Sequence, residues 1–237
     1  MKIMAITLIT ALTLGITACK GNPDSDDSIV ADIEGAEKLT ISAETGDVIQ
    51  FGGFDWRVLD IQDGKALVLS DKIVGEHLFD SSENPVTWED SELREYLGTV
   101  FYNDTFSAEE KELIDEITNH TAPNPWYGYE AAEGIDTVDK VFLLSIYEVI
   151  KYFGESGAVD NPPEPEGSPL IEDEFNADRI ATHNSSDKAT WWWTRSPGRG
   201  RRTIYVGDRG FIAVIGTHID NEHGGIRPAF WLILDSE

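Results

Sequence analysis

The sequence predicts an α+β fold: a single domain over residues 40–237, with a mixed, mostly antiparallel sheet and two to three helices. Short apolar runs separated by Gly-containing turns recur early and late in the chain, a pattern typical of strands joined by tight turns. Two Ser-x-x-Glu sequences between these runs are capping boxes, which open helices. With 237 residues, 41% of them hydrophobic, the chain is long enough to bury one sizeable core.

The residues before this domain are predicted to be a signal peptide over residues 1–18 and a flexible acidic tether over residues 19–39. Residues 3–16 are uncharged and apolar, but too few to span a bilayer. They lead into Ile16-Thr17-Ala18-Cys19, which resembles the bacterial lipobox and implies cleavage before Cys19 and a lipid on its thiol. Because Cys19 is the only cysteine, lipidation is the simplest explanation for it. We expect a lipid anchor at the extracytoplasmic face of the cell membrane; the alternative is an ordinary secretory signal peptide.

Three apolar runs open the domain, and we expect them to form a β-meander. The runs are Val48–Phe51, Trp56–Ile61 and Ala66–Ser70. Gly52-Gly53 separates the first two and Asp63-Gly64 separates the second from the third. These are turn sequences that tolerate the positive φ angles of tight hairpins.

Helical signals follow the meander. The capping box at Ser107–Glu110 predicts a helix that runs to about Thr118, and the one at Ser145–Glu148 predicts a helix to about Phe153. Val141–Leu144, directly before the second box, is a candidate buried strand. An earlier helix is indicated by apolar residues at helical spacing, namely Leu93, Tyr96, Leu97 and Val100.

The most unusual stretch contains three consecutive tryptophans, followed by an arginine-rich loop and a hairpin. In a strand, Trp191 and Trp193 lie on one side and Trp192 on the other, so protein must cover both sides or a ligand must cover one. The hairpin is predicted from Thr203–Val206 and Phe211–Ile215, which flank Gly-Asp-Arg-Gly. We predict a ligand-binding surface of exposed aromatic and charged residues at this end of the chain. Its candidate residues are Trp126, Trp192, Arg199, Arg201, Arg202, Asp208 and Arg209.

Structural roles are predicted for Trp193, Arg195 and Arg227. Both arginines lie beside a turn or a proline and near aromatic residues, where a guanidinium can stack and hydrogen-bond to carbonyl groups.

Two alternatives stay open for the loop arginines. They are solvated beside a core strand, or they pair with the acidic, proline-rich segment 164–174.

The charge distribution limits the partners. The chain carries a formal charge of −26, which argues against a nucleic-acid partner. Residues 191–231 hold six arginines and three carboxylates, a formal charge of +3, so the remainder carries −29. A basic face on an acidic body is suited to recognising anionic groups.

Six ordered motifs lie at Gly46–Gly52, Trp56–Asp60, Thr87–Leu97, Phe142–Glu148, Trp192–Gly198 and Gly225–Ala229. Together they give the chain a resemblance to a bacterial domain family of unknown function. That family is common in secreted and lipid-anchored proteins, and its signatures are W-W-L-R-S-P-G and G-V-R-P-A. Thr194 and Ile226 depart from those signatures. The layout of the late motifs is similar, more loosely, to the C-type-lectin-like fold, which implies an irregular ligand-binding surface built from the C-terminal half.

No catalytic constellation is recognisable. No cysteine remains for catalysis or zinc, and His218-x-Asp220-x-Glu222-His223 does not have the spacing of H-x-x-E-H, so we expect no metal or cofactor. The predicted function is a non-catalytic module that binds a glycan or protein ligand in the envelope or at the cell surface. A cell-envelope hydrolase, such as a glycoside hydrolase, and a structural envelope protein are the alternatives, because paired carboxylates cannot be identified by spacing alone.

Overall fold

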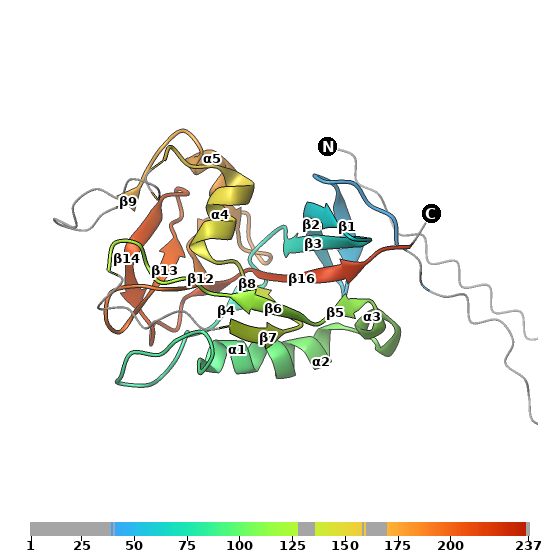
Figure 1. Cartoon of the computed structure of the whole chain (residues 1–237), viewed down its shortest axis with the longest axis horizontal. Helices are drawn as coiled ribbons and strands as arrows, with labels where there is room; N and C mark the ends of the chain where they lie inside the picture. The colour runs from blue at the N-terminus through green and yellow to red at the C-terminus, as the bar shows by residue number, and fades with distance from the viewer. Residues whose placement is uncertain (1–38, 40, 128–135, 158, 160–169, 236–237) are drawn as a thin grey trace, which may run out of the picture.

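The computed structural model describes residues 39, 41–127, 136–157, 159 and 170–235. The predicted signal peptide, Cys19 and nearly all of the tether lie outside the described residues. Two six-stranded sheets form the body of the domain, and mostly short helices cover them (Figure 1). The chain is therefore mixed α+β, with mostly antiparallel sheets and few helices. Among the described residues, no helix is both long enough and apolar enough to cross a membrane.

The first sheet confirms the predicted meander. Its order is β1-β2-β3-β16-β5, with β8 also pairing with β16, and every pairing is antiparallel. Gly52 and Gly53 have φ angles of 55° and 76°, and Gly64 has 74°, as the two tight turns require. The strands are β1 (Val48–Phe51), β2 (Phe54–Gln62), β3 (Lys65–Ser70), β5 (Ile114–Asp115), β8 (Phe142–Leu143) and β16 (Pro228–Ile233).

The second sheet contains the tryptophan strand and the predicted hairpin. Its order is β4-β15-β12-β13-β14-β9, and only the β12–β15 pairing is parallel. Two further strand pairs, β6–β7 and β10–β11, lie outside both sheets. The strands of this sheet are β4 (Gly75–Glu76), β9 (Leu170–Ile171), β12 (Trp192–Pro197), β13 (Arg202–Val206), β14 (Ile212–His218) and β15 (Gly225–Ile226). The two pairs are β6 (Ile117–His120) with β7 (Asp136–Asp139), and β10 (Ala181–Thr182) with β11 (Ala189–Thr190).

The first helical region is α1 (Glu92–Tyr96), the π-helical turn η1 (Leu97–Phe101) and α2 (Tyr102–Thr105). Leu93 and Leu97 are buried, but Val100, which falls at the same helical spacing, is 50% exposed. A π-helical turn closes i→i+5 bonds, and the wider turn rotates the residues after Leu97 relative to the core. Phe101 is buried in place of Val100.

The second helical region is shorter than predicted. The capping box of Ser107 and Glu110 is present and opens α3 (Ala108–Glu112). The helix does not reach Thr118, because Ile114 pairs with Leu232 in β16 and the next residues form β6. A strand partner more than a hundred residues away thus overrides the local helical pattern.

The third helical region matches its prediction. Ser145 and Glu148 form a capping box that opens α4 (Ile146–Phe153). This helix packs against β12 and is followed by the short helix α5 (Asn176–Arg179). In the view of Figure 1, α4 and α5 lie on one side of β16 and α1 and α2 lie on the other.

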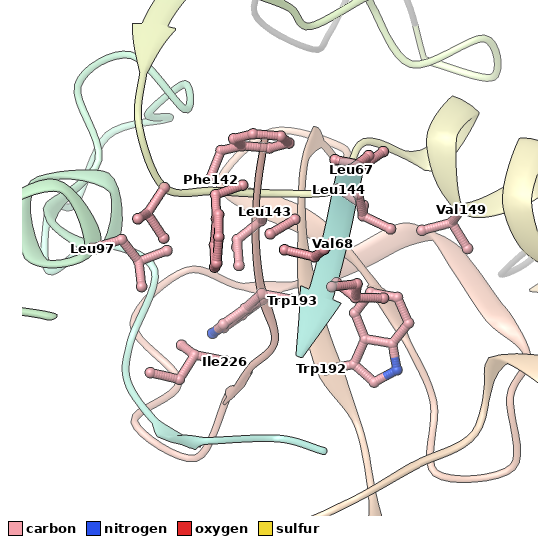
Figure 2. Close-up of a cluster of buried hydrophobic side chains, with 14 of the residues drawn as sticks. Leu67, Val68, Leu97, Phe142, Leu143, Leu144, Val149, Trp192, Trp193 and Ile226 are labelled. Carbon is pink, nitrogen blue, oxygen red and sulfur yellow. The ribbon is translucent and has the colours of Figure 1, made fainter. Parts of the chain in front are cut away.

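The core encloses both faces of the tryptophan strand. Trp192 and Trp193 are each 0% exposed and point to opposite sides of β12 (Figure 2). Trp193 packs near Leu97 and Ile226, while Trp192 lies on the side of Val149 from α4 (Figure 2). The alternation predicted for these tryptophans is correct, and protein rather than ligand covers both faces.

Candidate functional site

The arginine loop, defined as residues 199–202, is held rigidly at one end of the second sheet. The backbone N–H of Gly198 donates to the Arg202 carbonyl at 2.8 Å, and that of Arg199 donates to the Ile215 carbonyl at 3.0 Å. A Cβ atom at Gly198 would lie 2.6 Å from the Ile215 carbonyl oxygen, so only glycine permits this close approach. The loop therefore presents its side chains from a fixed backbone.

Two arginines of this loop contact groups from other parts of the chain. The Arg199 guanidinium lies 5.6 Å from the centroid of the Tyr127 ring. Arg201 donates from Nε to the Ser82 carbonyl at 2.6 Å and from Nη2 to Asp220 at 2.8 Å. The hydrogen bond from Arg201 lowers the pKa of Asp220 and outweighs the opposing effect of desolvation. The loop is thus partly paired, but with Asp220 rather than with the described end of the acidic segment 164–174.

Arg202 and the hairpin turn do not belong to one surface, contrary to our prediction. Arg202 begins β13 opposite His218 at the end of β14, and its Nη2 lies 3.2 Å from His218 Nε2. Asp208 and Arg209 follow the other end of β13, roughly 20 Å away at about 3.3 Å per residue. The strand geometry therefore places the arginine loop at one end of the hairpin and the predicted turn residues at the other.

The two predicted aromatic binding residues are not exposed, which is a second correction. Trp192 is 0% exposed, and its indole Nε1 donates to the Arg179 carbonyl at 3.2 Å. Trp126 is 9% exposed, and its backbone N–H donates to Asn124 Oδ1 at 2.9 Å. Removing these large apolar rings from water stabilises the folded protein, so they are buried in the core. Stacking of a sugar ring on either tryptophan is therefore not available.

Arg195 is buried at a junction of four segments. It is 2% exposed, and its guanidinium donates to the Leu143 carbonyl at 2.6 Å and to Thr121 Oγ1 at 3.1 Å. It also pairs with Glu148, and Nη2 donates to the His120 carbonyl at 3.2 Å. One side chain thus ties β12 to β8, to the first turn of α4 and to the end of β6, which supports a structural role.

Arg227 and Trp193 are also enclosed by the fold. Arg227 lies between β15 and β16, where the chain passes from one sheet to the other, and its Nε donates to the Ser70 carbonyl at 2.9 Å. Trp193 donates from its indole Nε1 to the His77 carbonyl at 2.9 Å. A Cβ atom at Gly224 would lie 1.7 Å from that same nitrogen. These contacts support structural roles for both residues.

Asp139 is a buried carboxylate that the sequence analysis did not identify. It lies at the edge of a groove of about 670 Å³ between α1 and β7. Asp139 accepts hydrogen bonds from Arg94 Nε at 2.6 Å and Thr137 Oγ1 at 2.6 Å. Asn119 and Trp88 donate to it at 3.0 Å and 3.2 Å. Burial by itself raises the pKa of Asp139, but these four hydrogen bonds outweigh it and hold the pKa below the usual range. Asp139 is therefore an ionised centre that connects α1 to β6 and β7.

A weak signal for this network was present in the sequence. Trp88 and Arg94 both belong to the motif at Thr87–Leu97, which pairs an indole donor with a guanidinium six residues later. Nothing local identified their acceptor, because Asp139 follows 45 residues after Arg94.

Metal-binding groups do not come together in the described part of the chain. No cluster of three or more His, Cys, Asp or Glu residues there is placed to hold a metal ion. His223 instead lies 3.2 Å from Glu76, and both are largely exposed.

The comparisons with known proteins identify a family but no relative of known activity. No curated protein matches the chain, and no solved structure matches it. A family model described as "Domain of unknown function (DUF6273)" matches residues 63–234, which is most of the chain and all but the first two strands of the fold. The expectation of a domain family of unknown function is confirmed at this level. The chain belongs to the DUF6273 family.

Proposed function

We propose that the chain is a membrane-anchored, extracytoplasmic, non-catalytic module that binds a glycan or protein ligand through the arginine loop. The observation that carries this proposal is the fixed backbone of that loop, which gathers Arg199, Arg201 and Arg202 at one end of a rigid sheet. Binding groups are commonly carried on loops that a rigid scaffold positions. A pre-ordered loop also loses little conformational entropy when it binds.

The ligand groups that suit this surface are anionic. Guanidinium groups donate in a planar fork that matches carboxylates, and the +3 segment contrasts with the −29 carried by the rest of the chain. General electrostatics would repel an anionic ligand from such an acidic protein, so capture requires a local cationic site. Because Trp126 and Trp192 are buried, arginines rather than stacked tryptophans carry the recognition.

The membrane anchor and the fold relationship complete the proposal. The sequence Ile16-Thr17-Ala18-Cys19 supports lipidation, and the acidic residues that follow support a tether between membrane and domain. The C-type-lectin-like relationship is retained as part of the proposal. It is supported by the mostly antiparallel sheets and by the position of the arginine loop in the C-terminal half.

The hydrolase alternative has less support. A glycoside hydrolase needs one carboxylic acid whose pKa is raised so that it can donate a proton. The described carboxyl groups with a displaced pKa include Asp60, Asp139 and Asp220, and hydrogen bonds displace each of them downward. Such groups stay ionised and suit binding or structural roles.

The test uses the full chain in a non-ionic detergent with three immobilised polymers: alginate, poly-L-glutamate and neutral dextran. We expect saturable, salt-sensitive capture on one or both anionic polymers and none on dextran. The Arg199→Ala/Arg201→Ala/Arg202→Ala variant should bind at least about tenfold more weakly, since several charge-assisted hydrogen bonds are lost. The matched control is Arg209→Ala at the far end of the same hairpin, which should bind like wild type. Equal capture by the triple variant and wild type would refute the proposed site.

A further inference from the structure

A second hollow, separate from the arginine loop, lies between β2, the end of α4 and the segment that runs from α5 to β10. Its volume is about 580 Å³. This lies within the range of about 300–1,000 Å³ typical of small-molecule sites. Its lining combines three cationic side chains, Arg57, Lys72 and Arg227, with two carboxylates, Asp71 and Asp178, and with the apolar side chains of Phe153 and Ile180. The hollow therefore offers positive charge and an apolar wall together.

Arg227 is the most unusual member of this lining. It is 2% exposed, yet Nη1 has no hydrogen-bond partner. Nε donates to the Ser70 carbonyl, and Nη2 makes a long contact of 3.4 Å to the Asp71 carbonyl. The guanidinium lies 5.1 Å from the ring centroid of Trp192 and 5.5 Å from that of Phe153. Aromatic rings stabilise the cation but supply no negative charge.

The other deeply buried arginines of the described chain each have a carboxylate partner. Arg195 pairs with Glu148, and Arg179 pairs with Asp173. Among the described residues, no ion pair is formed by Arg227. A buried charge without a counter-charge is strongly unfavourable, so proteins normally provide one. At Arg227 the described residues do not provide a counter-charge as a direct ion pair.

Asp71, the carboxylate whose charge acts on Arg227, is already engaged. Asp71 Oδ1 accepts from Arg57 Nη2 at 2.5 Å, so its charge is shared with a second cation. Burial lowers the pKa of Arg227 to about 10, an effect that Asp71 opposes and Arg57 reinforces. An anion at the Arg227 end of the hollow would supply the missing counter-charge, with Lys72 and Arg57 beside it.

We propose that this hollow binds a small organic anion. Its carboxylate or phosphate group lies at the Arg227 end, and its apolar part lies against Phe153 and Ile180. The unpaired buried guanidinium, the flanking cations and the apolar wall favour such a ligand independently of the arginine loop. This site would remain if the arginine loop bound nothing.

The test is an NMR chemical-shift titration of the full chain in a non-ionic detergent with benzoate, phenyl phosphate and benzyl alcohol. We expect saturable shifts of the amide signals of Lys72, Phe153 and Thr182 with at least one anion. Benzyl alcohol, which has the ring without the charge, should bind at least about tenfold more weakly, because the charge is what the site lacks. The preferred anion identifies the headgroup as carboxylate or phosphate.

Variants distinguish this site from nonspecific binding. Arg227→Ala can disrupt the core, so the test uses Ile180→Glu, in which a carboxylate is placed at a residue that is 40% exposed. Repulsion between the new carboxylate and the bound anion should weaken binding at least about tenfold in this variant. Val138→Glu, at an exposed position lining the other groove, is the matched control and should bind like wild type. The proposal is overturned by the absence of saturable shifts, by equal binding of benzyl alcohol, or by unchanged binding in Ile180→Glu.

Discussion

Replacing Arg195 with alanine removes a cation that joins β12 to three other segments of the protein. The variant loses the ion pair with Glu148 and the hydrogen bonds to the Leu143 carbonyl and Thr121 Oγ1. These acceptors remain in or near the core without their donor. Arg201 is the matched comparison, because it also has a carboxylate partner and a carbonyl acceptor but lies at the surface.

Breaking a buried ion pair typically costs about 3–5 kcal/mol. The lower end of this range applies to Arg195→Ala, because the Glu148 side chain is 25% exposed and water can solvate it once the arginine is removed. A loss of about 3 kcal/mol corresponds to a decrease in Tm of roughly 6–12 °C for a domain of this size. Exposed pairs contribute about 0–1 kcal/mol, so Arg201→Ala should lower Tm by no more than about 4 °C.

Differential scanning calorimetry of wild type, Arg195→Ala and Arg201→Ala at one pH and one salt concentration measures both changes. The Arg195→Ala/Glu148→Gln double variant shows whether the pair accounts for the loss, because coupled residues give non-additive changes. Equal and small decreases in Tm for the two single variants would refute the assignment of Arg195 as a structural residue.

The remaining predictions concern the anchor, a buried carboxylate and two glycines. Cys19→Ala should move the protein out of the membrane fraction, and full retention there, measured by fractionation and fatty-acid labelling, would contradict lipidation. Because the folded pKa of Asp139 is lowered, its contribution to stability is complete above about pH 5 and is lost as pH falls further. The difference in Tm between wild type and Asp139→Asn should therefore shrink on acidification, and a constant difference would contradict this. Gly224→Ala should destabilise the fold by moving Trp193, whereas Gly98→Ala, with open space around it, should be neutral or stabilising by up to about 1 kcal/mol. Urea unfolding measures the free energy of unfolding of both variants. Equal changes would show that the close approach of Trp193 to Gly224 does not restrict the side chain at this position.

Several elements of this fold were predictable because short-range chemistry specifies them. The meander turns need positive φ angles, and the sequence places glycine at three of those positions, Gly52, Gly53 and Gly64. Each capping box joins side chains only three residues apart, so Ser107 and Ser145 marked the starts of α3 and α4 correctly.

Long-range pairing accounts for the helix whose end was predicted incorrectly. The helix after Ser107 stops at Glu112 because Ile114 finds a strand partner in β16. Val100 turns outward because it lies within a π-helical turn, and helical spacing alone does not indicate such a turn. For α3 the local helical pattern was real, and the tertiary pairing with β16 decided where the helix ends.

Some features of the candidate site could likewise be predicted from the sequence, and others could not. The sequence by itself determined that a strand of alternating tryptophans leads into an arginine-rich loop and a hairpin, because alternation and turn chemistry are local. Only the tertiary structure decided that Trp192 and Trp126 are buried and that the hairpin separates the loop from Arg209. It also decided which buried arginines have counter-charges. Burial and ion pairing depend on residues distant in the chain, so Arg195 and Arg227, alike in sequence context, differ in the structure.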